Sequence, residues 1–172
     1  MLKISSLFTI YCSDRGVSHS FFSLCEQWNY PDCQVRMVVP NCAPSCRRPN
    51  LVEAVPRYLK LLYYRSADWP RNCTEKRFLR DVKDFDAIYL WPNTSIEIFR
   101  KVKQQSKPIF LHRINCYTKQ AKFIIDDASS RFGVAPQHLI TADMIQQKDE
   151  EISLADFIFC PSPEVKKSAL LN

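Results

Sequence analysis

The sequence predicts an α/β protein in which helices cover both faces of a parallel β-sheet. Short apolar runs alternate with longer amphipathic segments along the whole chain. Several of the runs are apolar at successive positions, which is typical of strands that are buried on both sides. The run at 157–160 is followed by a Pro-Ser turn and the start of a helix, as in half of a βαβ unit.

The first half of the chain has two clear strand signals. Residues 2–12 and 34–39 are rich in β-branched and aromatic side chains. Apolar spacing, capping residues and breakers predict helices around them. The expected elements are a strand at 2–12, a helix capped by Ser18, a strand at 34–39, a loop at 40–49, a basic aromatic helix at 51–65, an irregular stretch at 66–72 and a short helix at 75–82.

The second half repeats the strand–helix alternation more regularly. Pro92 stops one strand, lysines lie near the end of the next helix as its dipole favours, and Gly133 ends a helix that Thr118 begins. That helix carries an apolar stripe. The expected elements are strands at 86–91, 107–112 and 157–160, and helices at 95–105, 118–132 and within 135–153.

Composition limits the class of protein. The 172 residues suffice for one domain, 1–172, with a sizeable core, and an aromatic content of 12% excludes an intrinsically disordered chain. The two glycines exclude a GxGxxG or Walker A loop. The net charge of +6 favours anionic partners, but the basic residues form no block, so we expect no nucleic-acid partner.

The eight cysteines form no CxxC pair, and the start of the chain has no signal peptide. We therefore expect a cytoplasmic protein with reduced thiols that act as small hydrophobic side chains, and no metal site. No apolar stretch reaches the ~18–20 residues of a membrane-spanning helix.

Polar residues follow the predicted strands, where ligands of open parallel sheets bind. Arginines there suit a phosphate or carboxylate, and Asp or Asn side chains suit sugar hydroxyls. Structural roles compete with these: Ser162 as a helix cap, Asp14 as a turn residue and His112 as a packed core histidine. No catalytic residue is assigned. The candidate binding residues are Asp14, Arg15, Gly16, Asn93, Arg113, Asn115 and Ser162.

The end of the chain carries a family likeness. Residues 150–168 (EEISLADFIFCPSPEVKKS) resemble the stretch of family-four retaining glycosyltransferases that runs from a glutamate through Ala-Asp and Pro-Ser to Val-x-x-Ser. In that family the stretch closes the N-terminal domain of the GT-B fold. Segments 85–91 and 107–122 look like the later strands of that domain and the helix after them. The likeness covers most of 85–172, and before residue 85 only the order of elements agrees.

This resemblance implies two Rossmann-like domains that face a cleft. The first, present here, would bind a glycan or lipid-linked acceptor. A C-terminal domain after residue 172 would bind the nucleotide-sugar donor, so this chain would be inactive alone in hexosyl transfer and would hold no cofactor itself. Arg15 and Arg113 would stabilise the leaving diphosphate. The chain departs from the family in having only Gly16 where many relatives have a glycine pair, and Arg113 where many have a histidine beyond the fourth strand.

Two other interpretations remain open. The chain is also compatible with a stand-alone, flavodoxin-like binding or regulatory module without catalysis. The basic aromatic segment 57–71 also fits peripheral contact with a membrane surface, which agrees with a lipid-linked acceptor. A helix with one core-facing side and one solvated basic side is the simpler interpretation of that segment.

Overall fold

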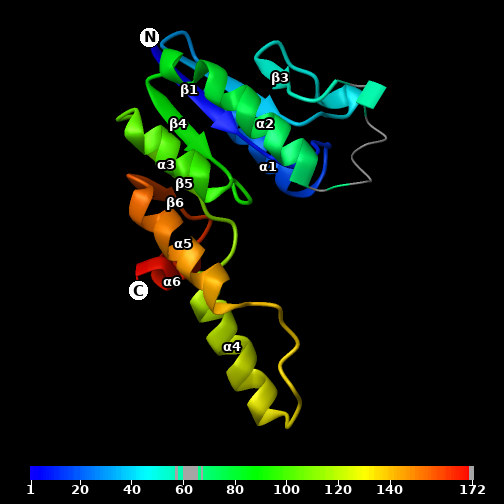
Figure 1. Ribbon diagram of the computed structural model, residues 1–172, viewed down its shortest axis with the longest axis vertical. Coiled ribbons are helices and arrows are strands. Elements are labelled where there is room, and N and C mark those ends of the chain that lie inside the picture. Colours follow the sequence, from blue (N-terminus) through cyan, green and yellow to red (C-terminus); the bar gives the residue numbers. More distant parts are fainter. Residues whose placement is uncertain (57, 60–65, 67, 171–172) are drawn as a thin grey trace.

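The centre of the molecule is a parallel sheet of six strands (Figure 1). The structure is a computed structural model that describes residues 1–56, 58–59, 66 and 68–170. The strands are β1 (Leu2–Leu7), β2 (Cys33–Val39), β3 (Leu51–Glu53), β4 (Ala87–Leu90), β5 (Ile109–His112) and β6 (Phe157–Phe159), in the spatial order β3-β2-β1-β4-β5-β6. The order reverses between β1 and β4, as in Rossmann-like sheets, which confirms the predicted fold class. The short β3 extends beyond the five-strand order of a flavodoxin-like sheet.

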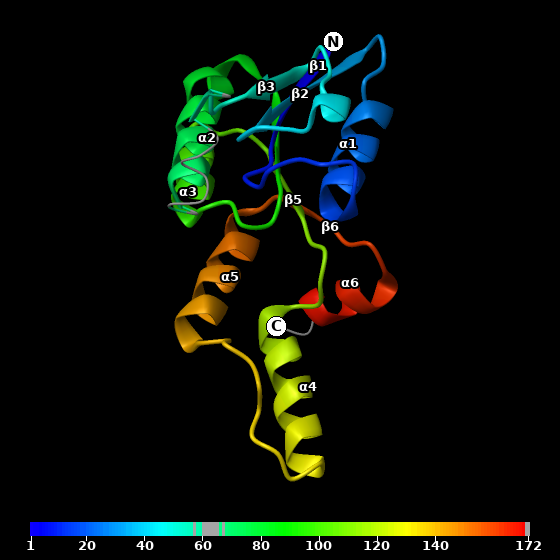
Figure 2. The same cartoon turned by 90° about the vertical axis from the view of Figure 1, so that its right-hand side faces the viewer.

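Helices lie on both faces of the sheet. Figure 2 shows α2 and α3 on one side and α1 on the other, with α5 continuing the layer of α3 and α4 extending away from the sheet. The bounds are α1 (Gly16–Gln27), α2 (Asp68–Asp81), α3 (Ile96–Gln104), α4 (Thr118–Arg131), α5 (Ala142–Leu154) and α6 (Pro163–Leu170). Within the described part of the chain, no helix has the length and apolar character to cross a membrane.

Two hydrophobic cores lie on the two faces of the sheet, and successive side chains of a strand pack alternately into one core and the other. In β4, Ile88 and Leu90 pack in the core that α2 and α3 cover, whereas Tyr89 packs with Trp91 in the core that α1 covers. Each of these four side chains is at most 1% exposed. Burial of such a side chain contributes about 1.5–3 kcal/mol, which is why the strand is apolar at every position.

The first strand is shorter than the sequence predicts. Hydrogen bonding in β1 ends at Leu7, although the amide of Phe8 still donates to the carbonyl of Val38 at 3.0 Å. The chain then leaves the sheet until Cys12, which pairs with Cys42 in an isolated parallel bridge. In this stretch Phe8 still belongs to the core, whereas Ile10 and Tyr11 are 44% and 41% exposed.

The helix predicted at 51–65 is wrong at its beginning. Leu51–Glu53 forms β3, which pairs in parallel with β2. Residues 57, 60–65 and 67 lie outside the described residues, so most of the segment predicted to touch a membrane does too. The short helix predicted at 75–82 begins earlier than expected: α2 also takes up residues 68–72 of the predicted irregular stretch, and it accepts Pro70 because this residue lies in the first turn.

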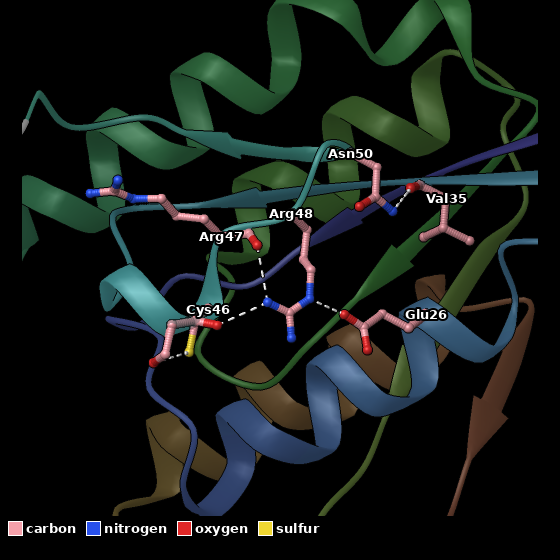
Figure 3. A network of polar contacts seen from close by, with 7 residues as sticks. Glu26, Val35, Cys46, Arg47, Arg48 and Asn50 are labelled. Carbon is pink, nitrogen blue, oxygen red and sulfur yellow. Dashed lines mark hydrogen bonds and ion pairs between the residues drawn. The ribbon is translucent and has the colours of Figure 1, made fainter.

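Polar contacts in the loop before β3 explain why a strand forms there. Figure 3 shows the Arg48 guanidinium between Glu26 of α1 and the loop carbonyls; it donates to the carbonyl of Ser45 at 2.9 Å. The side-chain amide of Asn50 donates to the carbonyl of Val35 in β2 at 2.7 Å. These bonds hold the loop against β2 and bring the next three residues into register with it.

Helix starts differ from the predicted caps. Ser18 lies inside α1, and its hydroxyl is 3.5 Å from the carbonyl of Tyr11 instead of capping the helix. At the start of α3, the amide and the hydroxyl of Ser95 both donate to the buried carboxylate of Glu75, each at 2.8 Å. A side chain from α2 therefore satisfies this end of α3. Ser162 does cap α6, because its hydroxyl accepts the amide of Val165 at 3.3 Å.

The closing segment ties the last elements together. Glu150 of α5 accepts two bonds from Arg100 of α3, at 2.6 and 2.8 Å. Asp156 accepts the amide of Ile109 at 2.9 Å at the start of β5. The hydroxyl of Ser168 in α6 accepts the amide of Tyr117 at 2.9 Å, immediately before α4. This segment therefore fixes where α4 begins.

Candidate functional site at the reversal of strand order

A pocket of about 400 Å³ opens at the carboxyl ends of β1, β4 and β5. It lies beside the reversal of strand order, where the chain leaves β1 and β4 for opposite faces of the sheet (Figure 2). Its wall consists of Phe8, Ile10, Val17, Pro92, Asn93, Leu111, His112, Arg113, Ile114, Asn115, Cys116, Thr118, Lys148 and Glu151. A larger hollow at the opposite end of the sheet contains Arg36 and Asp81, which already form an ion pair at 2.7 Å.

Three of the predicted binding residues, Asn93, Arg113 and Asn115, line this pocket. Gly16 lines an adjacent pocket of about 400 Å³, which shares His112 with the first. The φ angle of Gly16 is +59°, and the space in front of its α-carbon is open. A ligand could therefore approach the start of α1 closely at this point.

The other predicted binding residues lie elsewhere. Arg15 is exposed just before α1 and lines none of the pockets described above. Asp14 borders a small cavity of about 120 Å³ that also contains Glu26 and Arg48. Ser162 borders a separate hollow formed with α6, the helix that it caps. The rule that polar residues follow strand ends places these residues toward one edge of the sheet, but it does not give the direction of each side chain.

Asn93 holds its position through a strained backbone. Its φ angle is +70°, in the left-handed region that costs a non-glycine residue roughly 1 kcal/mol. The hydroxyl of Thr9 donates to the carbonyl of Asn93 at 3.2 Å and ties the loop after β4 to the loop after β1. The bond holds the backbone of Asn93 at the pocket, and the Asn93 side chain is exposed there.

Helix α5 brings two further residues to the pocket, Lys148 and Glu151, which are not among those predicted from the sequence. Glu151 is only 2% exposed, and its carboxylate accepts the Lys148 ammonium at 2.6 Å. Burial raises the pKa of Glu151, while the charges of Lys148 and Arg113 oppose that rise. In the sequence, both residues belong to a run of charges that is typical of a solvated helix face, and only the packing of α5 reveals them.

The positive charge of Arg113 has no direct hydrogen-bond or ion-pair partner among the described residues. Its amide donates to the carbonyl of Phe159 at 2.8 Å, which fixes the residue at the end of β5. The residue is 9% exposed, and its guanidinium forms no hydrogen bond or ion pair within the described residues. The pocket thus contains an arginine available to a ligand.

His112 forms a neutral part of the wall. Its Nδ1 shares a hydrogen bond of 2.7 Å with the hydroxyl of Tyr89, and its ring stacks on Trp91 with centroids 4.0 Å apart. Burial lowers the pKa of His112 to about 4 and raises that of Tyr89 well above its ordinary range. His112 is therefore a packed histidine, as the sequence indicates, and adds no positive charge to the pocket at neutral pH.

The buried cysteines Cys25 and Cys42 lack the features of reactive thiols. Burial raises the pKa of Cys25 to about 12 and that of Cys42 to about 11. Only Cys116 lines the pocket, and all eight cysteines are free. Among the described residues, no three His, Cys, Asp or Glu side chains come together as metal ligands would. The arrangement is suited to binding polar ligands through amides, cations and an apolar wall.

Comparison with known proteins finds no relative. No family model matches the chain, and no curated protein and no solved structure is detectably similar to it.

Proposed function

We propose that this chain is the acceptor-binding, N-terminal half of a nucleotide-sugar-dependent retaining glycosyltransferase. The observation that carries the proposal is the polar pocket beside the reversal of strand order, whose rim holds two amide side chains, Asn93 and Asn115. The likeness of residues 150–168 to the closing stretch of family-four glycosyltransferases supports the same conclusion.

The pocket suits a saccharide in two ways. Amide side chains offer both a donor and an acceptor, which is what a sugar hydroxyl requires. Apolar side chains such as Ile10 and Ile114 provide a surface for the C–H face of a sugar ring. An acceptor bound there would present its free hydroxyl at the mouth of the pocket.

The donor would bind outside this chain, on a second α/β domain that faces the same rim. The open backbone at Gly16 borders the adjacent pocket at the start of α1, and Arg15 directly precedes it in the chain. A cation at this place would stabilise the diphosphate that leaves when the sugar is transferred. Transfer would thus require both domains.

The proposal is tested by NMR titration of the isotope-labelled chain with a panel of neutral saccharides. We expect at least one to shift the amide signals of the loops after β4 and β5. Asn93→Ala and Asn115→Ala should each weaken binding about fivefold, because a net hydrogen bond contributes about 1 kcal/mol. Asn72→Ala, an exposed change on α2, is the control and should have no effect. Absence of saccharide binding up to high millimolar concentration would contradict the proposal.

A transfer assay separates this proposal from a stand-alone binding module. The product of the complete gene would be incubated with labelled nucleotide-sugars and a saccharide that the pocket binds. We expect transfer that retains the configuration of the sugar. Saccharide binding without transfer, together with no second α/β domain encoded in the gene, would favour a binding or regulatory module.

A further inference from the structure

The proposed acceptor pocket holds more positive than negative charge. Two cations, Arg113 and Lys148, face one carboxylate, Glu151, which pairs with Lys148 at 2.6 Å. The charge of Arg113 is therefore left over. An ion that is largely removed from water is costly without a partner of opposite charge, so the free protein gains if an anion binds beside Arg113.

The start of α4 adds a second source of positive potential at the same wall. Thr118, the first residue of this helix, lines the pocket. The side chain of the N-cap residue, Tyr117, accepts no hydrogen bond from the first amides of the helix. The amide of Tyr117 donates to Ser168, and that of Ala121 to the carbonyl of Tyr117, so the amides of 118–120 have no partner within the helix. A helix start carries about half a positive charge and binds anions through such amides.

We propose that the pocket binds a phosphate monoester, which makes the acceptor of the proposed reaction a phosphorylated compound. The inference rests on the proposed function only in treating the bound compound as the acceptor of the reaction. The phosphate site itself is inferred from Arg113, Lys148 and the start of α4. The guanidinium would bind two phosphate oxygens at once, and the helix amides the third.

The magnitude of the local charge favours a monoester over other oxyanions. One excess cation plus about half a charge from α4 gives roughly +1.5. A phosphate monoester carries about −1.5 to −2 at pH 7. A carboxylate or a phosphodiester carries about one negative charge and leaves the site partly uncompensated. The diphosphate of a nucleotide-sugar consists of such singly charged groups, so the donor matches this site less well.

Inorganic phosphate, acetate and an intact nucleotide-sugar, UDP-glucose, are the probes, titrated into the isotope-labelled chain at constant ionic strength. We expect phosphate to bind most tightly and to shift the amide signals of 113–120. Arg113→Gln should weaken phosphate binding at least tenfold, whereas Arg80→Gln, a change of an exposed arginine on α2 away from the pocket, should leave it unchanged. Glu151→Gln should tighten binding several-fold because it removes the competing negative charge.

Three results would overturn the inference: equal phosphate affinity in Arg113→Gln and the wild type, weaker binding in Glu151→Gln, or tighter binding of UDP-glucose than of phosphate at the same amides. The second variant matters because loss of Arg113 could disturb folding, and a general loss of structure cannot tighten binding. The two proposals fail separately. Binding of neutral saccharides without phosphate would refute only the phosphate site, and phosphate binding without saccharides would refute only the proposed function.

Discussion

Acidification should destabilise the protein through one residue, His112. The pKa of this buried ring is about 4, against 6.5 for an exposed histidine. Between these two values the unfolded chain takes up a proton that the folded chain does not. The contribution of neutral His112 to the free energy of unfolding is therefore complete above pH 6.5, and it is lost as the pH falls from 6.5 to about 4. The full span corresponds to about 3 kcal/mol, of which about 2.5 kcal/mol is lost by pH 4.5.

Urea unfolding at pH 7 and pH 4.5, followed by circular dichroism, measures this loss. His112→Asn removes the titrating ring but keeps a polar atom near Nδ1 for the Tyr89 hydroxyl. The variant will be less stable at both pH values, yet its stability should fall by about 2.5 kcal/mol less than that of the wild type. The exposed His19→Asn is the matched control and should behave like the wild type.

Other titrating groups do not obscure this comparison. The raised pKa of Glu151 acts in the opposite direction, since its protonation favours the folded state as the pH falls. Asp126 and Asp156, whose pKa values are lowered by their partners, lose stabilisation only below about pH 4. All three groups are present in the wild type and in His112→Asn, so their effects cancel in the difference. The reasoning would be refuted if both proteins lost the same free energy.

Three further predictions concern stability and access to the site. Glu75→Ala should lower the free energy of unfolding by about 2–3 kcal/mol, because it leaves the amide of Ser95 without its charged acceptor. Urea unfolding measures this loss. A loss below about 0.5 kcal/mol, which is the usual range for surface substitutions, would contradict the prediction. Asn93→Gly should raise the unfolding free energy by up to about 1 kcal/mol through relief of the left-handed backbone, and a decrease would show that the Asn93 side chain stabilises the loop. Cys116 should react with iodoacetamide in the native protein, and bound phosphate should protect it, whereas the buried Cys25 should react only in urea. Peptide mass spectrometry distinguishes the two labelled cysteines. Unchanged labelling of Cys116 in the presence of phosphate would place the anion elsewhere.

The strands were predictable where the chain is buried on both sides. The β4 and β5 segments are almost unbroken apolar runs, because each successive side chain enters one of the two cores. The three residues of β3 were not predictable, since so short a strand has no period of its own. It forms because Arg48 and Asn50 hold the preceding loop against β2, and those contacts are set by residues far away in the sequence.

Half of the site was visible in the sequence for a similar reason. Arg113 and Asn93 directly follow strands, and the carboxyl ends of parallel strands must share an edge. Lys148 and Glu151 come from a helix whose apolar pattern is weak, and they reach the pocket only because α5 packs on α3 through Glu150 and Arg100. Asp14 follows a strand end too, but the loop after β1 turns it toward Glu26 and Arg48.

The closing segment connects the family likeness to the chemistry of the pocket. Most of its polar residues are occupied in holding the fold together: Glu150 on α3, Asp156 at the start of β5, and Ser162 at the start of α6. Ser168 takes the amide of Tyr117 and so sets the position of the helix start that lines the pocket. Glu151 has a different place, because it lies in the pocket beside Lys148. The segment 150–168 thus determines both the shape and the net charge of the site, although it lies far from Arg113 in the sequence. A substitution at one of its polar positions would therefore change the structure that positions the others.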